Sequence, residues 1–161
     1  MTRVRAVAFL TSALLLPAVS MAECATEAPA AGRQFWESRS HFYEKADPSL
    51  RDITTPRFFA ALKREWACAA KGASCVAYAP WPHPGDASIA GHPTFYVSLE
   101  RPDHVLVSMN YALRGDYGRA GRPQFVIMTL TQRPDNRCWL LDDLVTEQLG
   151  SLRERFPGPD S

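Results

Sequence analysis

The chain has 161 residues, of which 46% are apolar and 22% charged, and 18 Lys and Arg residues oppose 17 Asp and Glu residues. This composition excludes full disorder, and this length suits one domain rather than two. A net charge this close to zero also argues against a dedicated nucleic-acid-binding protein, which needs a basic surface.

Residues 1–22 have the layout of a secretory signal peptide. Two arginines precede an apolar run over residues 7–16, and small residues stand before a predicted cleavage after Ala22. The run is about half as long as the ~20 residues of a spanning helix, which favours cleavage over anchoring. Lipoprotein processing at Cys24 is the alternative, although Glu23 stands where a small residue is expected. We therefore expect a periplasmic or secreted protein that has no membrane contact after cleavage.

Four cysteines remain after this cleavage, and an even number in an exported chain predicts disulfides. We expect a Cys68–Cys75 bond, which closes a short loop and contributes about 2–3 kcal/mol. By elimination Cys24 would then bond to Cys138 and tie the mature N-terminus to the last strand. The alternative pairs Cys75 with Cys138 and leaves Cys24 unpaired. No CxxC motif occurs, so we expect no zinc site at the cysteines.

The mature chain is expected to be one domain over residues 32–157, between a flexible segment at 23–31 and a tail at 158–161. A first helix is predicted from residue 32 to residue 46, because two aromatic pairs recur seven residues apart and share one face. Asp-Pro at residues 47 and 48 would end it. The pairs are Phe35 with Trp36 and Phe42 with Tyr43.

A second helix is expected to begin at Thr55, which can cap it, with Pro56 in the first helical position. The helix is predicted to end near Lys71. Its apolar residues recur at helical spacing and form an aromatic stripe that we interpret as core packing. The stripe comprises Phe58, Phe59, Leu62, Trp66 and Ala69.

The next segment, residues 79–93, is rich in proline and is predicted to be a long loop. Its Trp81 is expected to be exposed between rigid turns, which suits a contact surface. We take Trp81, His83 and Asp86 as the candidate binding residues.

Four strand-like runs follow at residues 94–100, 104–113, 124–132 and 138–145, and a short helix is expected at 146–156. The runs alternate in polarity and are separated by turn residues, so they predict an antiparallel meander. Helices that precede strands in this way indicate an α+β fold. One face of the sheet would be covered by the aromatic stripes of the first two helices.

The segments at residues 35–43, 80–86, 105–111 and 138–145 resemble the nuclear transport factor 2-like (SnoaL-like) superfamily. Within it, the chain resembles an uncharacterised family of exported bacterial proteins that carry a domain of unknown function. The resemblance covers residues 33–156. It implies a conical fold in which helices and a curved antiparallel sheet enclose a cavity. It implies no particular activity, because this fold carries enzymes, binding modules and assembly domains alike.

No catalytic residue, metal site or cofactor is predicted. The histidines show no HxH, HExxH or HxxxH spacing. The remaining catalytic candidates are Asp142 or Asp143 as a general base, with Tyr96 as a phenol donor, because a carboxylate buried in an apolar strand has a raised pKa. The structural alternative is a cap for the following helix or an ion pair with an arginine: Arg57, Arg114 or Arg137.

The sequence thus favours a non-enzymatic exported binding protein whose partner is another protein or a small apolar ligand. One alternative is a small cavity enzyme of the isomerase or dehydratase type that uses a buried aspartate. The other is an envelope scaffold that dimerises through its sheet, or an immunity or inhibitor protein. Aromatic side chains that fill the cavity would count against the enzyme, and an apolar outer sheet face would favour the scaffold. The filling residues would be Trp36, Phe42, Phe59 and Trp66.

Overall fold

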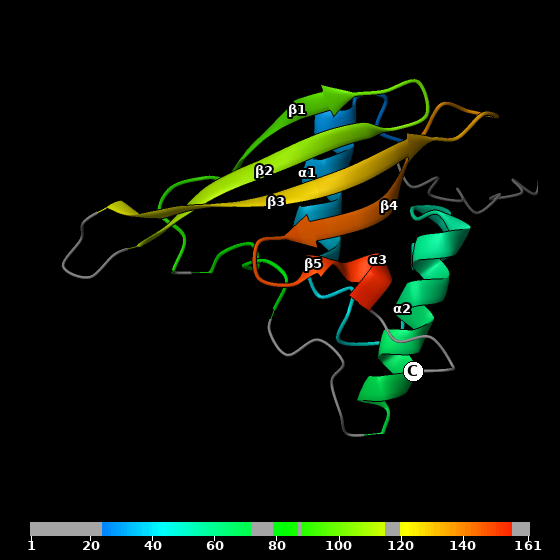
Figure 1. Ribbon diagram of the computed structural model, residues 1–161, viewed down its shortest axis with the longest axis horizontal. Helices are drawn as coiled ribbons and strands as arrows, with labels where there is room; N and C mark the ends of the chain where they lie inside the picture. The colour runs from blue at the N-terminus through cyan, green and yellow to red at the C-terminus, as the bar shows by residue number, and fades with distance from the viewer. Residues whose placement is uncertain (1–23, 72–78, 87, 115–119, 156–161) are drawn as a thin grey trace, which may run out of the picture.

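The computed structural model describes residues 24–71, 79–86, 88–114 and 120–155. Within these ranges the chain forms a five-stranded antiparallel sheet and three α-helices, so the predicted α+β class and the meander are confirmed. The strands follow one another across the sheet in sequence order, as Figure 1 shows.

The helical elements are α1 (Ala28–Arg39), the 3-10 helix η1 (Pro48–Asp52), α2 (Pro56–Ala69) and α3 (Leu152–Arg155). The strands are β1 (Thr94–Glu100), β2 (Val105–Arg114), β3 (Ala120–Gln132), β4 (Trp139–Thr146) and β5 (Gly150–Ser151).

Helix α1 begins earlier and ends earlier than predicted. It starts at Ala28 rather than at residue 32, so the end of the segment predicted to be flexible is helical. A proline in its first turn suits this start, because the missing N–H has no helical partner there. After Arg39 the α-helical hydrogen bonding ends. The N–H of Phe42 donates to the carbonyl of Arg39 at 3.0 Å, which forms a turn. The turn still places Phe42 and Tyr43 in the core with the first aromatic pair, as the shared face predicted.

Helix α2 forms as predicted at its start. The hydroxyl of Thr55 accepts a hydrogen bond from the N–H of Phe58 at 3.2 Å, and Pro56 occupies the first turn. The stripe residues Phe58, Leu62 and Trp66 are buried. Core packing therefore explains most of the residues in the aromatic stripe.

The C-terminal helix predicted at residues 146–156 is largely replaced by other structure. Thr146 ends β4, and its hydroxyl accepts a hydrogen bond from the N–H of Leu149 at 3.0 Å. Gly150 then has φ of 68°, a left-handed conformation that glycine adopts without steric penalty. The resulting reversal pairs β5 with β4 and leaves only α3 as helix.

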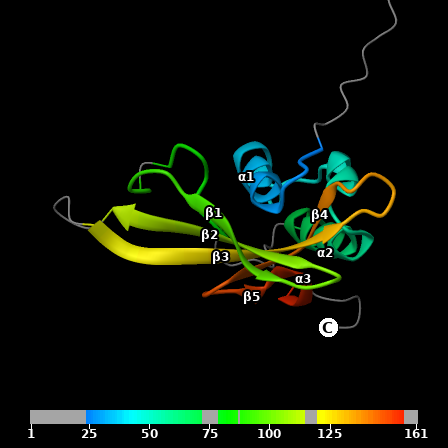
Figure 2. The ribbon, with the colours of Figure 1, turned by 90° about the horizontal axis from the view of Figure 1, so that it is seen from above.

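One face of the sheet is covered by α1 and by the loop that precedes β1, and Figure 2 shows both on the same side. Helix α1 comes very close: a Cβ added at Gly32 would lie 3.2 Å from the sulfur of Met128 and 3.3 Å from Val107. These contacts fix Val107 and Met128 on the covered face. No helix of the described part of the chain covers the opposite face of β1, β2 and β3 (Figure 2).

The described residues contain the Cys24–Cys138 disulfide, which joins the segment before α1 to the start of β4. The predicted pairing is confirmed for this bond, and the alternative Cys75–Cys138 bond is wrong. Cys68 is also disulfide-bonded, and its predicted partner Cys75 lies outside the described residues. No helix in the described ranges has the length and apolarity needed to cross a bilayer.

Candidate functional site

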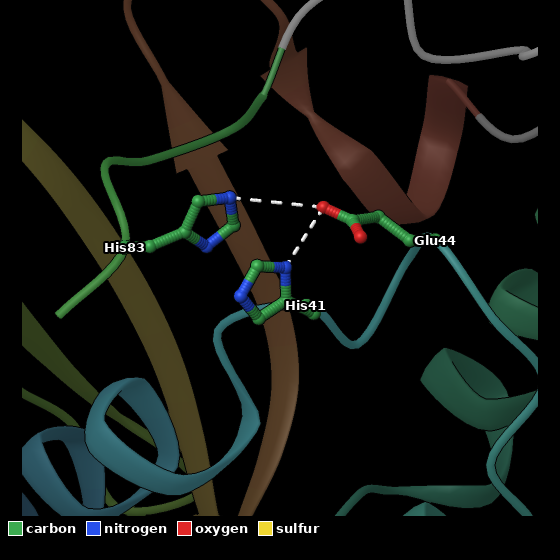
Figure 3. A group of neighbouring side chains, drawn as sticks. All are labelled: His41, Glu44 and His83. Carbon is green, nitrogen blue, oxygen red and sulfur yellow. Dashed lines mark hydrogen bonds and ion pairs between the residues drawn. The ribbon is translucent and has the colours of Figure 1, made fainter. Parts of the chain in front are cut away.

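Three side chains from two segments that are distant in sequence converge beside the end of α1 (Figure 3). His41 and Glu44 belong to the turn after α1, and His83 comes from the loop before β1. One oxygen of Glu44, Oε1, lies 2.9 Å from His41 Nδ1 and 3.7 Å from His83 Nε2. The two imidazole rings stack, with centroids 3.7 Å apart and planes within 11°. We call these three residues the histidine–glutamate cluster.

Two tryptophan side chains hold the backbone on both sides of the histidine–glutamate cluster. The indole N–H of Trp81 donates to the carbonyl of Ser40 at 2.9 Å, and that of Trp36 donates to the carbonyl of Pro82 at 2.7 Å. Each acceptor immediately precedes one of the two histidines. The loop and the turn are therefore tied to each other next to both imidazoles.

The turn itself is anchored in the core. Phe42 is buried, and its carbonyl accepts a hydrogen bond from the indole N–H of Trp66 on α2 at 3.0 Å. Between Phe42 and Glu44, Tyr43 is buried, and its hydroxyl hydrogen-bonds to the Glu44 carboxylate. Burial, followed by the charge and the hydrogen bond of Glu44, raises the pKa of Tyr43 to about 12. Tyr43 thus stays a neutral donor to Glu44.

Glu44 is a carboxylate at neutral pH. Its hydrogen bond with His41 is the largest influence and lowers the pKa of Glu44, with further lowering from the charge of His41 and the bond from Tyr43. The carboxylate therefore presents a full negative charge to both imidazoles.

The predicted exposure of Trp81 is wrong. Its side chain is 2% exposed and packs in the core with ring centroids 5.9 Å from Phe35 and 5.7 Å from Phe42. The physical reason is that an indole buries a large apolar area once its N–H finds an acceptor, here the carbonyl of Ser40. The loop is therefore part of the core and offers no exposed aromatic at this position.

The other two predicted binding residues lie beside Trp81. His83 is half-buried and Asp86 exposed, and both line a hollow of about 200 Å³ with Trp81. Asp86 accepts a hydrogen bond from the N–H of Ser88 at 2.8 Å, and this bond is the largest influence that lowers the pKa of Asp86. The structure thus brings the three predicted residues together, with Asp86 shaping the loop.

Asp142 is held by three donors from different elements. Its Oδ1 accepts from the hydroxyl of Thr55 at 2.6 Å, and its Oδ2 accepts from Arg57 at 2.8 Å and from Arg153. Burial raises the pKa of Asp142, but the bonds from Thr55 and Arg57 and the charges of both arginines outweigh burial and lower it. The raised pKa expected for a general base is therefore wrong for Asp142, and the predicted ion pair with Arg57 is confirmed.

Asp143 caps the following helix, which is the other structural role that the sequence left open for these aspartates. Its carboxylate accepts from the hydroxyl of Ser151 at 2.6 Å and from the backbone N–H of Arg153 at 3.0 Å. These bonds cap the start of α3. Tyr96 lies on β1, which β2 and β3 separate from β4, and its hydroxyl accepts from Asn110 at 3.0 Å. The structure therefore does not bring Tyr96 together with either aspartate.

Replacing Asp142 by asparagine should lower the free energy of unfolding by about 3 kcal/mol at pH 7, because Arg153 and Thr55 lose their anionic acceptor. The lowered pKa of Asp142 in the folded state means that this contribution is present above the unfolded pKa of an aspartate, about 3.9, and is lost as the pH falls through the folded value. Urea unfolding of wild type and D142N should therefore converge in acid. The exposed Asp135→Asn is the matched control, and an equal loss in both variants would contradict the prediction.

Between the helices and the sheet, aromatic side chains occupy the space where the resemblance places a cavity. Ring contacts connect Phe42 with Phe58 and Phe59 with Trp66, and Trp36 contacts Phe95 on β1. The residues predicted to fill such a cavity are all buried or packed against the core: Trp36, Phe42, Phe59 and Trp66.

The uncovered face of the sheet is a second candidate site. The register places Tyr96 opposite Ser108 and Asn110 opposite Phe125 on this face, and Tyr96 and Phe125 are 45% and 46% exposed. Alternation along β1, β2 and β3 places a set of uncharged residues on this face. We call this surface the open sheet face. The set is Thr94, Tyr96, Leu99, Leu106, Ser108, Asn110, Phe125, Ile127 and Thr129.

Sequence reasoning missed the histidine–glutamate cluster. The HxxE spacing of His41 and Glu44 was a usable signal, since residues three apart lie on one side of a helical turn. Nothing in the sequence paired that turn with His83. No protein-family model matches the chain, and a search of the curated proteins finds no match.

Proposed function

We propose that this is an exported, non-enzymatic binding protein that binds another protein through the open sheet face. The observation that carries the proposal is the uncharged character of this face, together with its exposed aromatic rings. Cores of protein–protein interfaces are depleted of charge and enriched in tyrosine and phenylalanine. An exposed face of this kind on a folded domain typically marks an interaction site.

Two observations favour binding over catalysis. The aromatic packing occupies the interior where a cavity enzyme of this resemblance would hold its substrate. Both oxygens of Asp142 are engaged by donors, and Asp143 caps α3, so both carboxylates have structural partners. The hollow beside His83, at about 200 Å³, is also smaller than the ~300–1,000 Å³ of typical small-molecule pockets. The proposal of a protein partner therefore rests on the uncharged open sheet face and its exposed rings.

Export is the second part of the proposal. Disulfides persist in oxidising compartments, and both Cys24 and Cys68 are disulfide-bonded. The signal-peptide layout of residues 1–22 agrees with such a compartment, and those residues lie outside the described ranges. We propose that the mature chain begins after Ala22 and works in the periplasm or outside the cell.

A nuclear transport factor 2-like fold is the third part of the proposal. Helices that precede an antiparallel meander agree with it. So do the register shifts in the β1–β2, β2–β3 and β3–β4 pairs, because bulges bend a sheet. In such a fold the side of the sheet away from the helices is free for a partner.

Phe125→Asp should abolish binding of the partner, because it replaces an exposed ring of the uncharged open sheet face by a charge. We expect at least a tenfold loss of the protein that co-purifies from extracts of the native host. Val97→Asp is the matched control: Val97 is 41% exposed on β1, but lies opposite Val107 on the other face. The measurement is quantitative mass spectrometry of the captured protein, alongside the solution mass of each variant.

Two outcomes would overturn the proposal. Equal capture by wild type, F125D and V97D would show that the partner does not use the open sheet face. A wild-type dimer that F125D separates into monomers would assign the face to a second copy of the chain. The scaffold alternative would then replace the binding protein.

A further inference from the structure

We propose that His41, Glu44 and His83 form a binding site for a divalent transition-metal ion, with Zn²⁺ as the best match. The site lies between the end of α1 and the loop before β1 and shares no residue with the open sheet face (Figure 3).

The geometry of the cluster fits a tetrahedral ion. Zinc bonds to imidazole nitrogen and carboxylate oxygen are about 2.0–2.1 Å long, which places neighbouring ligand atoms about 3.3 Å apart. The distances from Glu44 Oε1 to the nitrogens of His41 and His83, 2.9 and 3.7 Å, lie on either side of that value. The three ligand atoms all lie within 4.8 Å of one another. Binding would require the two stacked imidazole rings to rotate until a nitrogen of each faces the ion.

The donor set selects the class of ion. Two imidazole nitrogens and one carboxylate oxygen suit zinc and its neighbours among the transition metals, whereas magnesium and calcium prefer oxygen ligands alone. Neutral imidazole and ionised carboxylate are the forms that bind a metal.

The imidazole of His83 is poorly satisfied by the protein, and an ion at Nε2 would give it one strong bond. Among the described residues its Nδ1 is buried without a hydrogen-bond partner. Its other nitrogen, Nε2, lies 3.7 Å from Glu44, which is too long for a hydrogen bond. An ion between Nε2 and Glu44 Oε1 would give the imidazole a strong ligand bond and explain why this ring points at the carboxylate.

The surroundings of the cluster resemble the supporting shell of a metal site. Ligating carboxylates are usually hydrogen-bonded by a second residue, as Glu44 is by Tyr43. The tryptophan N–H bonds to Ser40 and Pro82 fix the backbone next to each histidine. His41 remains 61% exposed, which leaves the fourth position of the ion open to water. The arrangement therefore corresponds to an open three-ligand site.

Calorimetric titration of the oxidised, untagged protein with zinc chloride tests the proposal. Wild type should saturate at one equivalent, and His41→Ala, Glu44→Gln and His83→Ala should each weaken binding at least tenfold. His92→Ala is the matched control, since His92 is an exposed histidine of the same loop, and it should bind as wild type does. Cobalt(II) should give the visible absorption of a four-coordinate ion in wild type and lose it in H41A.

The proposal is overturned if wild type shows no saturable binding, or if H41A and H83A bind zinc as tightly as wild type. An equal loss in H92A would also overturn it, because binding would then be scattered over surface histidines. His41 is mostly exposed, so H41A should keep the fold even if H83A does not. Near-ultraviolet circular dichroism of each variant checks this point.

Discussion

Replacing Trp81 by alanine should lower the free energy of unfolding by about 3–5 kcal/mol. The side chain is almost completely buried and contacts the rings of Phe35 and Phe42, so its removal leaves a large cavity. It also removes the hydrogen bond to Ser40, which leaves that carbonyl without its indole donor. Urea unfolding followed by far-ultraviolet circular dichroism measures the loss.

Trp81→Phe separates the two contributions, because it keeps a ring in the core and removes only the N–H donor. We expect it to lose about 1–3 kcal/mol. A loss below about 1 kcal/mol in W81A would mean that the loop does not pack as described, since cavity formation in a core exceeds that value.

Replacing both Cys24 and Cys138 by serine should lower the free energy of unfolding by about 4 kcal/mol. The bond joins residues 114 positions apart, so it closes a very long loop and restricts the unfolded chain strongly. It also fixes the start of the described chain to β4, next to the hydrogen bond that Trp139 donates to the carbonyl of Thr26 at 3.1 Å.

Trp139→Phe is the control for the disulfide prediction, because it removes the neighbouring hydrogen bond to Thr26 and keeps the disulfide. It should cost about 1 kcal/mol, the usual net value of one hydrogen bond. If the double serine variant unfolds at the same urea concentration as W139F, loop closure is not the main contribution of this disulfide.

Local patterns in the sequence were sufficient for most of the fold. The Thr55-Pro56 start of α2 and the bounds of β1 were predicted correctly, because capping and alternation depend on neighbouring residues. The end of α1 and the replacement of the last helix by β5 were not. Both depend on tertiary contacts: Phe42 must reach the core, and Gly150 must reverse the chain beside β4.

The sites were harder to predict than the fold. The sequence indicated that Asp142 lies in an apolar strand, but it did not show that two arginines from α2 and α3 would meet there. It singled out His83 in the right loop, but expected Trp81 to be exposed beside it. Hydrophobicity alone would have placed Trp81 inside, and the prolines around it argued for a surface loop. The pairing of His83 with the turn after α1 is a long-range contact that a single sequence does not encode in any local pattern.

The two proposed sites have no residue in common and can be tested with separate variants. The histidine–glutamate cluster lies between the end of α1 and the loop before β1, and the open sheet face lies on the side of β1, β2 and β3 that no described helix covers. Loss of zinc binding in H41A should therefore leave capture of a protein partner unchanged. Loss of the partner in F125D should likewise leave zinc binding unchanged.

Site-specific photo-crosslinking in the native host tests whether the open sheet face is the binding surface. Benzoylphenylalanine would be placed at position 125 on the open sheet face and, in a separate strain, at position 97 on the opposite face. We predict a crosslink from position 125 to one other protein and none from position 97. Crosslinks from both positions, from neither, or from position 125 only to a second copy of the chain would contradict the claim.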